Sequence, residues 1–374
     1  MINQFYNRGN ISIKDKIFSL DYILIISVLL LGIISFFAMY STEQGQLGYY
    51  TQNHIYRFSI FFLLFILLSL VRIETMHKVS YLFYFIVLIL LICVDIFGIT
   101  ASGSKRWINI IAFNLQPSEL MKVGLIIFLA RYYNKVPVGD LNSIKYLIVP
   151  IFALFIPVAL IVNQPDLGTA ILIAVGGLSV VWLAGFRLKF FIYGMVFLTT
   201  LVPVLISFLK PYQKSRILTF FNPERDPLGA GYQIIQSKIA IGSGGIFGKG
   251  FLKGSQSYLD YLPEKHTDFI FTLFSEEFGF IGCLVLLFIY ALIIYRILHI
   301  GLNSRNNFSR LFCYGFASIF FLYVGVNMSM VLGLLPIVGA PLPIMSYGGS
   351  SLLSMMIGLG VVMSCKIHSG DELT

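Results

Sequence analysis

Charged residues are scarce in this chain, because Asp, Glu, Lys and Arg together make up only 11% of its 374 residues. Soluble globular domains carry roughly twice that share. Apolar residue types reach 57%, and the mean hydropathy is +0.86. These values exclude an ordinary soluble domain and indicate a protein that crosses a membrane many times.

Cysteine and histidine are also rare, with four and five residues respectively. The four cysteines all fall within apolar runs and show no metal-ligand spacing, so neither a disulfide framework nor a zinc site is indicated. The histidines are scattered along the chain, and no Ser/His/Asp arrangement for nucleophilic catalysis is apparent. Metal-centred and triad enzymes are therefore disfavoured.

Ten apolar runs are long enough, or nearly so, to span about 30 Å of hydrocarbon. They cover residues 22–40, 56–72, 79–99, 118–133, 145–163, 167–186, 189–209, 270–296, 309–332 and 346–366. The sequence therefore predicts an all-α integral membrane protein with about ten transmembrane helices. No separate soluble domain is apparent, so residues 1–374 are expected to form one polytopic domain.

The distribution of basic residues predicts the orientation of this domain. Short segments on one side of the predicted membrane hold most of the Lys and Arg, whereas those on the other side hold only Arg57, Lys105 and Arg106. The positive-inside rule then places both termini in the cytoplasm and the loop at 210–268, between the seventh and eighth helices, outside. The net charge of +9 is largely a topology signal and needs no nucleic acid to explain it.

The outer loop departs from that rule, because it contains more basic than acidic residues. The basic residues are Lys210, Lys214, Arg216, Arg225, Lys238, Lys249, Lys253 and Lys265. Its glycine-rich part, 242–250, lacks the spacing of a Walker A sequence, although backbone amides in such a loop can bind phosphate. The loop modestly favours an anionic lipid head group as ligand, and its first half is compatible with an amphipathic helix on the membrane.

A carboxylate lies where this loop meets the eighth apolar run. Asp268 precedes Phe-Ile-Phe, and Glu276 and Glu277 interrupt the same run shortly afterwards. Ionisable groups at membrane depth cost on the order of 2.5–3.5 kcal/mol each on insertion scales. Asp268 is therefore either a solvated interface anchor or a functional group.

Two further polar segments precede apolar runs on the outer side. Glu119 and Lys122 are three residues apart, so they share a helix face. They form either a structural ion pair or a pair facing a cavity shared with substrate. The segment 163–169 joins two helices in about three residues, and Asp166 is expected to cap the second one.

The segment 333–351 is apolar but has too many prolines and glycines for a regular helix. Non-helical backbone at membrane depth is tolerated only where it is buried in protein or lines a cavity. A re-entrant segment before the tenth helix is therefore expected, beside a binding site.

Composition and topology leave two functional classes open. A transporter or flippase would use the broken segment and the intramembrane charges. An enzyme acting on a lipid-borne substrate would use Asp268 as a base that takes a proton from an acceptor hydroxyl. Nearby cations would then stabilise a departing diphosphate.

Five segments, in this order, resemble the SEDS family of bacterial shape, elongation, division and sporulation proteins. They are 116–119, 163–168, 226–250, 262–271 and 341–351. The resemblance covers nearly the whole chain. It is strongest to the elongation branch, through residues 254–257 and 264–266, while the division branch is similar throughout.

The resemblance implies a peptidoglycan glycosyltransferase that polymerises lipid II on the outer face of the bacterial cytoplasmic membrane. It implies a class B penicillin-binding protein as crosslinking partner, contacts with elongation-complex proteins, and undecaprenyl diphosphate as leaving group. Nucleic acid is not an expected partner. A lipid II flippase, a scaffold without activity and a division-specific polymerase are the alternatives.

By the same resemblance, Asp268 of the His-Thr-Asp-Phe motif is the catalytic residue, with His266 and Thr267 beside it. Glu119 and Lys122 match a polar pair in the family's central cavity. Cations proposed for the diphosphate are, in falling order, Lys122, Arg106, Lys249 and Lys265. A divalent cation, Mg²⁺ or Mn²⁺, is a further candidate, although the sequence has no ligand signature for it.

Overall fold

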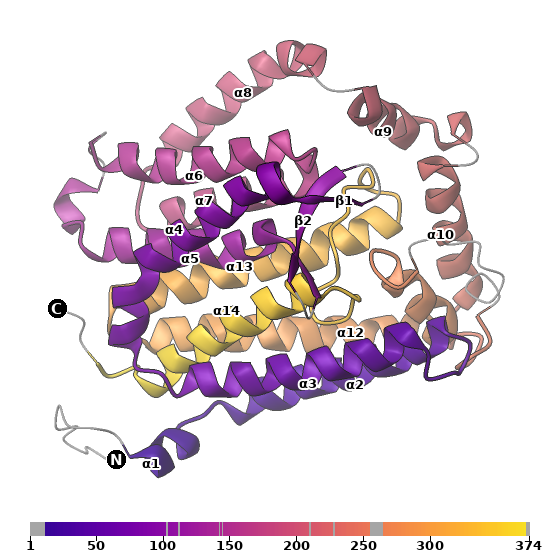
Figure 1. Ribbon diagram of the computed structural model, residues 1–374, viewed down its shortest axis with the longest axis horizontal. Helices are drawn as coiled ribbons and strands as arrows, with labels where there is room; N and C mark the ends of the chain where they lie inside the picture. The colour runs from indigo at the N-terminus through magenta and orange to yellow at the C-terminus, as the bar shows by residue number, and fades with distance from the viewer. Residues whose placement is uncertain are drawn as a thin grey trace.

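The computed structural model describes residues 12–101, 104–110, 113–141, 143, 145–208, 211–226, 229–254 and 265–371. Parts of the predicted motifs, at 102–103, 210, 227–228 and 255–264, lie outside the described residues. The described chain is mostly helical (Figure 1).

A helix occupies each of the ten predicted apolar runs. These helices are α2 (Tyr22–Thr42), α3 (Tyr49–Ser69), α4 (Ile73–Phe97), α5 (Pro117–Asn134), α6 (Lys145–Asn163), α7 (Leu167–Leu183), α8 (Leu188–Phe208), α12 (Ile270–Asn303), α13 (Asn307–Val331) and α14 (Gly349–Ile367). Within the described residues, seven helices are long and apolar enough to cross a membrane, namely α2, α3, α4, α6, α12, α13 and α14. The all-α membrane class is confirmed, while the count of ten spans stays a prediction.

The remaining elements are short. They comprise α1 (Ile13–Phe18), α9 (Pro211–Phe221), α10 (Ala230–Gly244), the 3₁₀ turns Val138–Asp140 and Pro223–Arg225, and three strands, β1 (Ile99–Ala101), β2 (Ser104–Ile110) and β3 (Phe113–Leu115). The strands form an antiparallel sheet in the order β1-β2-β3. This small sheet was not predicted from the sequence. Its strands contain isoleucine, threonine, tryptophan and phenylalanine, which favour β structure.

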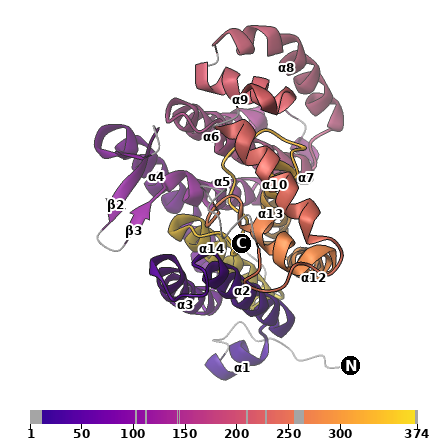
Figure 2. The ribbon, with the colours of Figure 1, turned by 90° about the vertical axis from the view of Figure 1, so that its right-hand side faces the viewer.

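Helices α5, α13 and α14 form the centre of the bundle, and most of their residues are buried. Helix α14 packs against α3, and α13 packs against α12, α7 and α5. In contrast, α8 lies at the upper edge of the molecule (Figure 2), and α9, which follows it, contacts α10. The described part of the outer loop leads into α10, which packs against α12 and α13.

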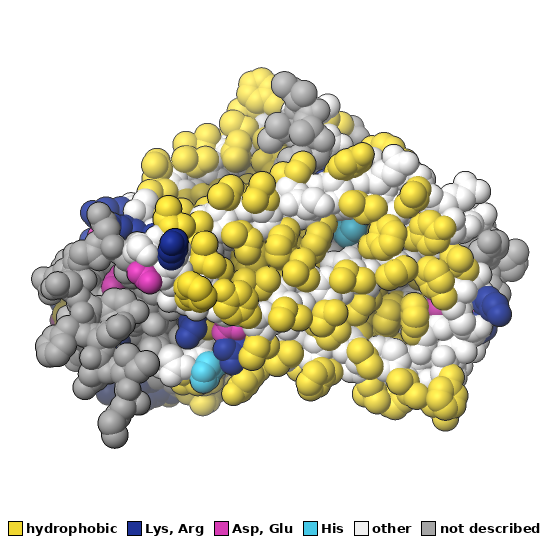
Figure 3. All heavy atoms as spheres, turned by 90° about the horizontal axis from the view of Figure 1, so that it is seen from below, with side chains coloured by type: hydrophobic (Ala, Val, Ile, Leu, Met, Phe, Trp, Pro, Cys, Tyr) yellow, Lys and Arg dark blue, Asp and Glu magenta, His cyan; other side chains and the backbone are white. Residues whose placement is uncertain are grey.

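Helix α1 and the end of α14 lie at the same end of the bundle, at the left in Figure 1. The Lys16 ammonium donates to the Leu70 carbonyl (2.7 Å), and the Ser364 hydroxyl donates to the neighbouring Val71 carbonyl (2.7 Å). Apolar side chains cover the middle of the face seen from below, and charged ones gather toward its ends (Figure 3). The position of α1 and the end of α14 at one end of the bundle agrees with the prediction that both termini lie on the same side of the membrane. Which side this is stays a prediction.

Helix α12 is broken at Gly279, whose φ of 63° lies outside the helical range. The glycine-rich segment 244–250 packs into this break. The amides of Lys249 and Gly250 donate to the carbonyls of Glu276 and Glu277 (both 3.0 Å), and the Phe280 amide donates to the Gly245 carbonyl (3.0 Å). The segment thus satisfies groups that the break leaves without helical partners.

Candidate active site

Three successive carbonyls hold the backbone of the His-Thr-Asp motif. The His266 carbonyl accepts from the Tyr347 amide (2.9 Å). The Thr267 carbonyl accepts from the Ser346 hydroxyl (2.7 Å), and the Asp268 carbonyl accepts from the Asn327 amide nitrogen (2.9 Å). The motif is therefore fixed just before the first turn of α12, and Asp268 itself is partly exposed.

Asn327 joins the motif to the glycine- and proline-rich segment. Its Nδ2 atom also donates to the Ala340 carbonyl (2.7 Å), and the residue is fully buried on α13. One amide group thus binds two irregular segments that are far apart in the sequence. Asn327 was not predicted as a site residue, although a single amide within an otherwise apolar run signals a buried polar contact.

Residues 332–348 contain no regular helix, as predicted from their prolines and glycines. A Cβ atom on Gly339, whose φ is 71°, would lie 3.7 Å from Asp268 Oδ2. A Cβ atom on Gly168, at the start of α7, would collide with the Val338 carbonyl. Gly339 thus supplies the left-handed backbone of the turn beside the Asp268 carboxylate, and Gly168 permits the close approach of this segment to the 163–168 motif. Its position relative to a membrane stays a prediction.

His266 contacts the C-terminal end of α2 and the N-terminal end of α3. Its Nδ1 atom lies 2.8 Å from Thr42 Oγ1, and its ring stacks on the Tyr50 ring with centroids 4.0 Å apart. Tyr50 also packs edge-on against Tyr347 at 5.0 Å. Lys265, directly before His266, is 7% exposed.

Glu119 and Lys122 form the predicted ion pair on the first turns of α5. Lys122 Nζ lies 2.5 Å from Glu119 Oε2, and both side chains are buried. The ammonium also lies 3.7 Å from the centroid of the Tyr323 ring. Tyr323 and Asn327 are one turn apart on α13, so one face of that helix links the pair to Asp268.

Asp166 connects three elements at the N-terminal end of α7. Its carboxylate accepts from the Thr169 amide (3.2 Å) and from Gln116 Nε2 (3.2 Å), and it lies 3.5 Å from the Arg106 guanidinium on β2. The predicted capping role is confirmed. Burial raises the pKa of the Asp166 carboxyl, although the charge of Arg106 opposes this rise.

Lys249 and the glycine-rich segment, whose amides the sequence suggests could bind phosphate, contact α12 in the structure. The Lys249 ammonium lies 2.6 Å from the buried Glu276 carboxylate. The amides of Gly248, Lys249 and Gly250 donate to carbonyls of Gly244, Glu276 and Glu277. Because these amides already have partners, the segment's observed role is to fill the break in α12.

A divalent cation held by the protein needs several oxygen or nitrogen ligands close together. Within the parts of the chain that the structure describes, no three His, Cys, Asp or Glu side chains gather into a metal-binding group. The nearby carboxylates of Glu119, Asp166 and Glu276 each face a basic side chain. The donor set therefore does not fit a resident metal ion held by these residues.

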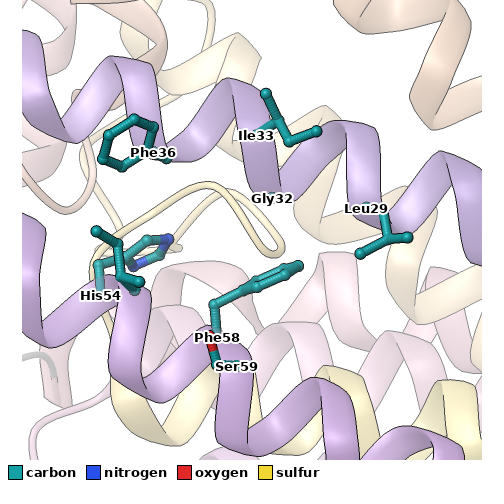
Figure 4. Close-up of a pocket in the computed structure, with 8 residues that line it drawn as sticks. Leu29, Gly32, Ile33, Phe36, His54, Phe58 and Ser59 are labelled. Carbon is teal, nitrogen blue, oxygen red and sulfur yellow. The ribbon is translucent and has the colours of Figure 1, made fainter.

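An apolar groove of about 330 Å³ lies between α2 and α3 (Figure 4). Its lining residues are Leu29, Gly32, Ile33, Phe36, His54, Ile55, Phe58 and Ser59. His54 Nε2 lies 2.6 Å from Ser35 Oγ, which donates to the Met345 carbonyl (2.9 Å). The groove is thus connected to the irregular segment beside Asp268.

Comparison with known proteins gives matches over most of the chain. A sequence model of the family described as "Cell cycle protein" (FtsW, RodA, SpoVE) matches residues 16–370. The peptidoglycan glycosyltransferase MrdB of Escherichia coli K12 is 46% identical over 286 residues, which are 76% of this chain and 77% of that protein.

Two solved structures have a similar fold. One comes from a study of the coordination of polymerization and crosslinking by a peptidoglycan synthase complex. It has a TM-score of 0.81 and 32% identity, and the match covers 94% of this chain and 98% of that one. The other is the rod shape determining protein RodA of Thermus thermophilus, with a TM-score of 0.71, 26% identity, and coverage of 94% and 98%.

Proposed function

The chain belongs to the family of FtsW, RodA and SpoVE cell cycle proteins, and on that premise we propose that it is a peptidoglycan glycosyltransferase. It polymerises lipid II into glycan strands during cell-wall elongation. The similarity to MrdB supports this activity, and the resemblance to the RodA structure favours elongation over division. The observation that carries the proposal is the fixed His266–Asp268 backbone, which holds a carboxylate beside an irregular segment and a buried ion pair.

In the proposed reaction, Asp268 takes the proton from the 4-hydroxyl of the acceptor lipid II sugar. The oxygen attacks the anomeric carbon of the growing chain, the bond to the diphosphate breaks, and undecaprenyl diphosphate leaves. The α-linked donor gives a β-linked product, so one base suffices and no covalent sugar intermediate forms, as in inverting glycosidases.

The setting of this reaction is also part of the proposal. The protein lies in the bacterial cytoplasmic membrane with Asp268 on the outer side, and it works with a class B penicillin-binding protein that crosslinks the strands. The match to a protein from a peptidoglycan synthase complex supports a crosslinking partner. Any Mg²⁺ or Mn²⁺ is proposed to arrive with the diphosphate of the substrate, because the described carboxylates do not form a metal site.

The test is polymerisation of lipid II by the purified chain, with and without its class B partner, in the presence of Mg²⁺, Mn²⁺ or EDTA. Wild type should give glycan ladders, and Asp268→Asn should give none while keeping its elution volume and melting temperature. Long strands from Asp268→Asn would remove the catalytic role from Asp268. Absence of strands from wild type under every condition, together with translocation of labelled lipid II across liposomes, would establish the flippase alternative.

A further inference from the structure

Most of the cations proposed for the diphosphate already have counter-ions. Arg106 faces Asp166, Lys122 faces Glu119, and Lys249 faces Glu276. The Arg106 guanidinium also donates to the carbonyls of Gln164 and Pro165. A cation whose charge and donors are engaged in this way attracts a further anion less strongly.

Arg57 on α3 is in a different situation. Its guanidinium carbon lies 4.9 Å from the centroid of the Tyr347 ring, and the side chain is partly buried. The Tyr347 amide donates to the His266 carbonyl, so Arg57 lies at the same end of the bundle as the Asp268 motif. The guanidinium also hydrogen-bonds to the Tyr347 side chain. Because a guanidinium has five N–H donors, this bond and the cation–π contact hold it in place and leave other N–H groups able to donate.

The position of Arg57 on α3 explains why it faces this site. Tyr50, His54 and Arg57 follow the spacing i, i+4, i+7, so they share one face of the helix. Tyr50 contacts His266 and Tyr347, and His54 reaches Met345 through the Ser35 hydroxyl. The whole face thus packs against the irregular segment beside Asp268.

Within the described residues, no carboxylate lies within ion-pair distance of Arg57. Glu43, at the neighbouring end of α2, uses its two carboxylate oxygens to accept from the Tyr50 and Thr51 amides (3.0 and 2.8 Å). A partly buried charge without a counter-ion is unfavourable in the protein alone. The planar guanidinium is also the side chain best suited to two-point binding of phosphate oxygens.

From these contacts we propose that Arg57 binds the diphosphate of the polyprenyl-linked substrate, with Tyr347 holding its guanidinium in position. The inference rests on the proposed function and names the residue that meets the leaving group. A phosphate of an ordinary membrane lipid offers similar chemistry, so the experiment must separate the two sources. As the bond to the sugar breaks, negative charge grows on the diphosphate, and a fixed cation stabilises it.

The first experiment measures binding by calorimetry in an uncharged detergent, with farnesyl diphosphate, farnesol and phosphatidylglycerol as probes. Wild type should bind farnesyl diphosphate at least about tenfold more tightly than farnesol, the size expected for a charge-assisted hydrogen bond. Arg57→Gln should lose this preference, and Arg57→Lys should keep part of it. An unchanged preference in Arg57→Gln, or equal competition by phosphatidylglycerol, would overturn the inference.

A matched control is Lys105→Gln, since the Lys105 ammonium donates to the Asp95 and Ile96 carbonyls (2.7 and 3.2 Å). It should behave as wild type in the binding assay. All variants are first compared in elution volume and melting temperature, so that a folding defect is recognised.

The second experiment measures polymerisation kinetics with the partner present. Arg57→Gln should raise the KM for lipid II about tenfold and weaken inhibition by inorganic diphosphate to a similar degree. If wild type makes no strands but its diphosphate preference still depends on Arg57, the proposed function fails and the binding site stands. If strands form and both constants of Arg57→Gln stay within twofold of wild type, the binding site fails and the function stands.

Discussion

Lys122 and Glu119 form a buried pair in which each residue depends on the other. Both are almost completely inaccessible, and Lys122 also contacts the Tyr323 ring. Removing one partner of such a pair leaves an unpaired charge and typically costs about 3–5 kcal/mol. The pair therefore matters for stability as well as for any contact with substrate.

We expect Lys122→Met to lower both the melting temperature and polymerisation. Adding Glu119→Gln should recover much of the melting temperature, because no buried charge remains, but should not recover polymerisation. Arg187→Ala, on the predicted cytoplasmic side, is the control and should cost less activity than Lys122→Met. Full recovery of activity in the double variant would reduce the pair to a structural role.

The Glu119–Lys122 pair and the Asp166 cap could be predicted from local spacing, whereas the long-range contacts of the site could not. The three-residue separation of Glu119 and Lys122, and the place of Asp166 before a helix, are properties of short segments. The roles of Asn327 and Arg57 depend on contacts with segments that are distant in the sequence and adjacent in space. No local pattern contains that information.

The carboxylate of Glu43 caps the start of α3. Although burial alone would raise its pKa, hydrogen bonds from Thr51 and Tyr50 outweigh burial, so the pKa of Glu43 is lowered from its usual 4.5. A carboxyl with a lowered pKa in the folded state stabilises the protein above its unfolded-state pKa. That contribution is lost as the pH falls through the folded-state value.

Wild type should therefore melt at a higher temperature than Glu43→Gln at neutral pH, and the difference should shrink as the pH falls below about 4.5. Thermal melting in detergent over a pH series measures this difference. Gln52→Ala, which removes an amide that donates to the Leu47 carbonyl in the same turn, provides a control without a titrating group. A constant difference across the whole series would contradict the capping role.

Asn327 on α13 binds the backbone just before α12, at Asp268, and the middle of the irregular segment 332–348, at Ala340. Replacing it with the similarly sized Leu leaves the Asp268 and Ala340 carbonyls without this donor. Because small displacements of a catalytic group can cost about 100-fold in rate, we expect kcat to fall by up to that factor while KM changes little.

The matching control for Asn327→Leu is Ser318→Ala, whose hydroxyl bonds only within α13, to the Tyr314 carbonyl (2.9 Å). Steady-state kinetics with the partner present would distinguish the two variants. An unchanged kcat in Asn327→Leu would mean that the Ser346 and Tyr347 contacts suffice to hold Asp268.

Across the whole molecule, the glycine-rich segment joins the outer loop to α12. Gly248 has a φ of 81°, and a Cβ atom there would collide with the Glu277 carbonyl. Gly248→Val should therefore destabilise the fold strongly, whereas Gly242→Ala, in open space on α10, should be neutral or slightly stabilising. Melting temperatures in detergent test both, and equal values would show that the segment yields without cost.

The membrane class and the helix positions followed from hydropathy, because ten long apolar runs leave few other solutions. What the glycine-rich segment contacts could not be decided from the sequence. Its composition suits either a phosphate or another backbone, and only the break at Gly279 in α12 shows that another backbone fills it. The β1–β3 sheet was missed because its strands are too short to give a clear alternating pattern.

The break at Gly279 divides α12 into a part next to the Asp268 motif and a longer part that is predicted to cross the membrane. The part of the predicted apolar run after the break, residues 280–296, extends about 26 Å at about 1.5 Å per residue, against a hydrocarbon thickness of ~30 Å. It therefore supplies most of the crossing, while the Asp268 backbone just before α12 is tied to Asn327, which also binds the irregular segment. Residues 244–250 bond to both sides of the break, at Glu276, Glu277 and Phe280, so we expect the two halves of α12 to keep their angle. Tilting of the membrane-crossing half in a thicker or thinner lipid layer should then displace the carboxylate, so the reaction should depend on acyl-chain length.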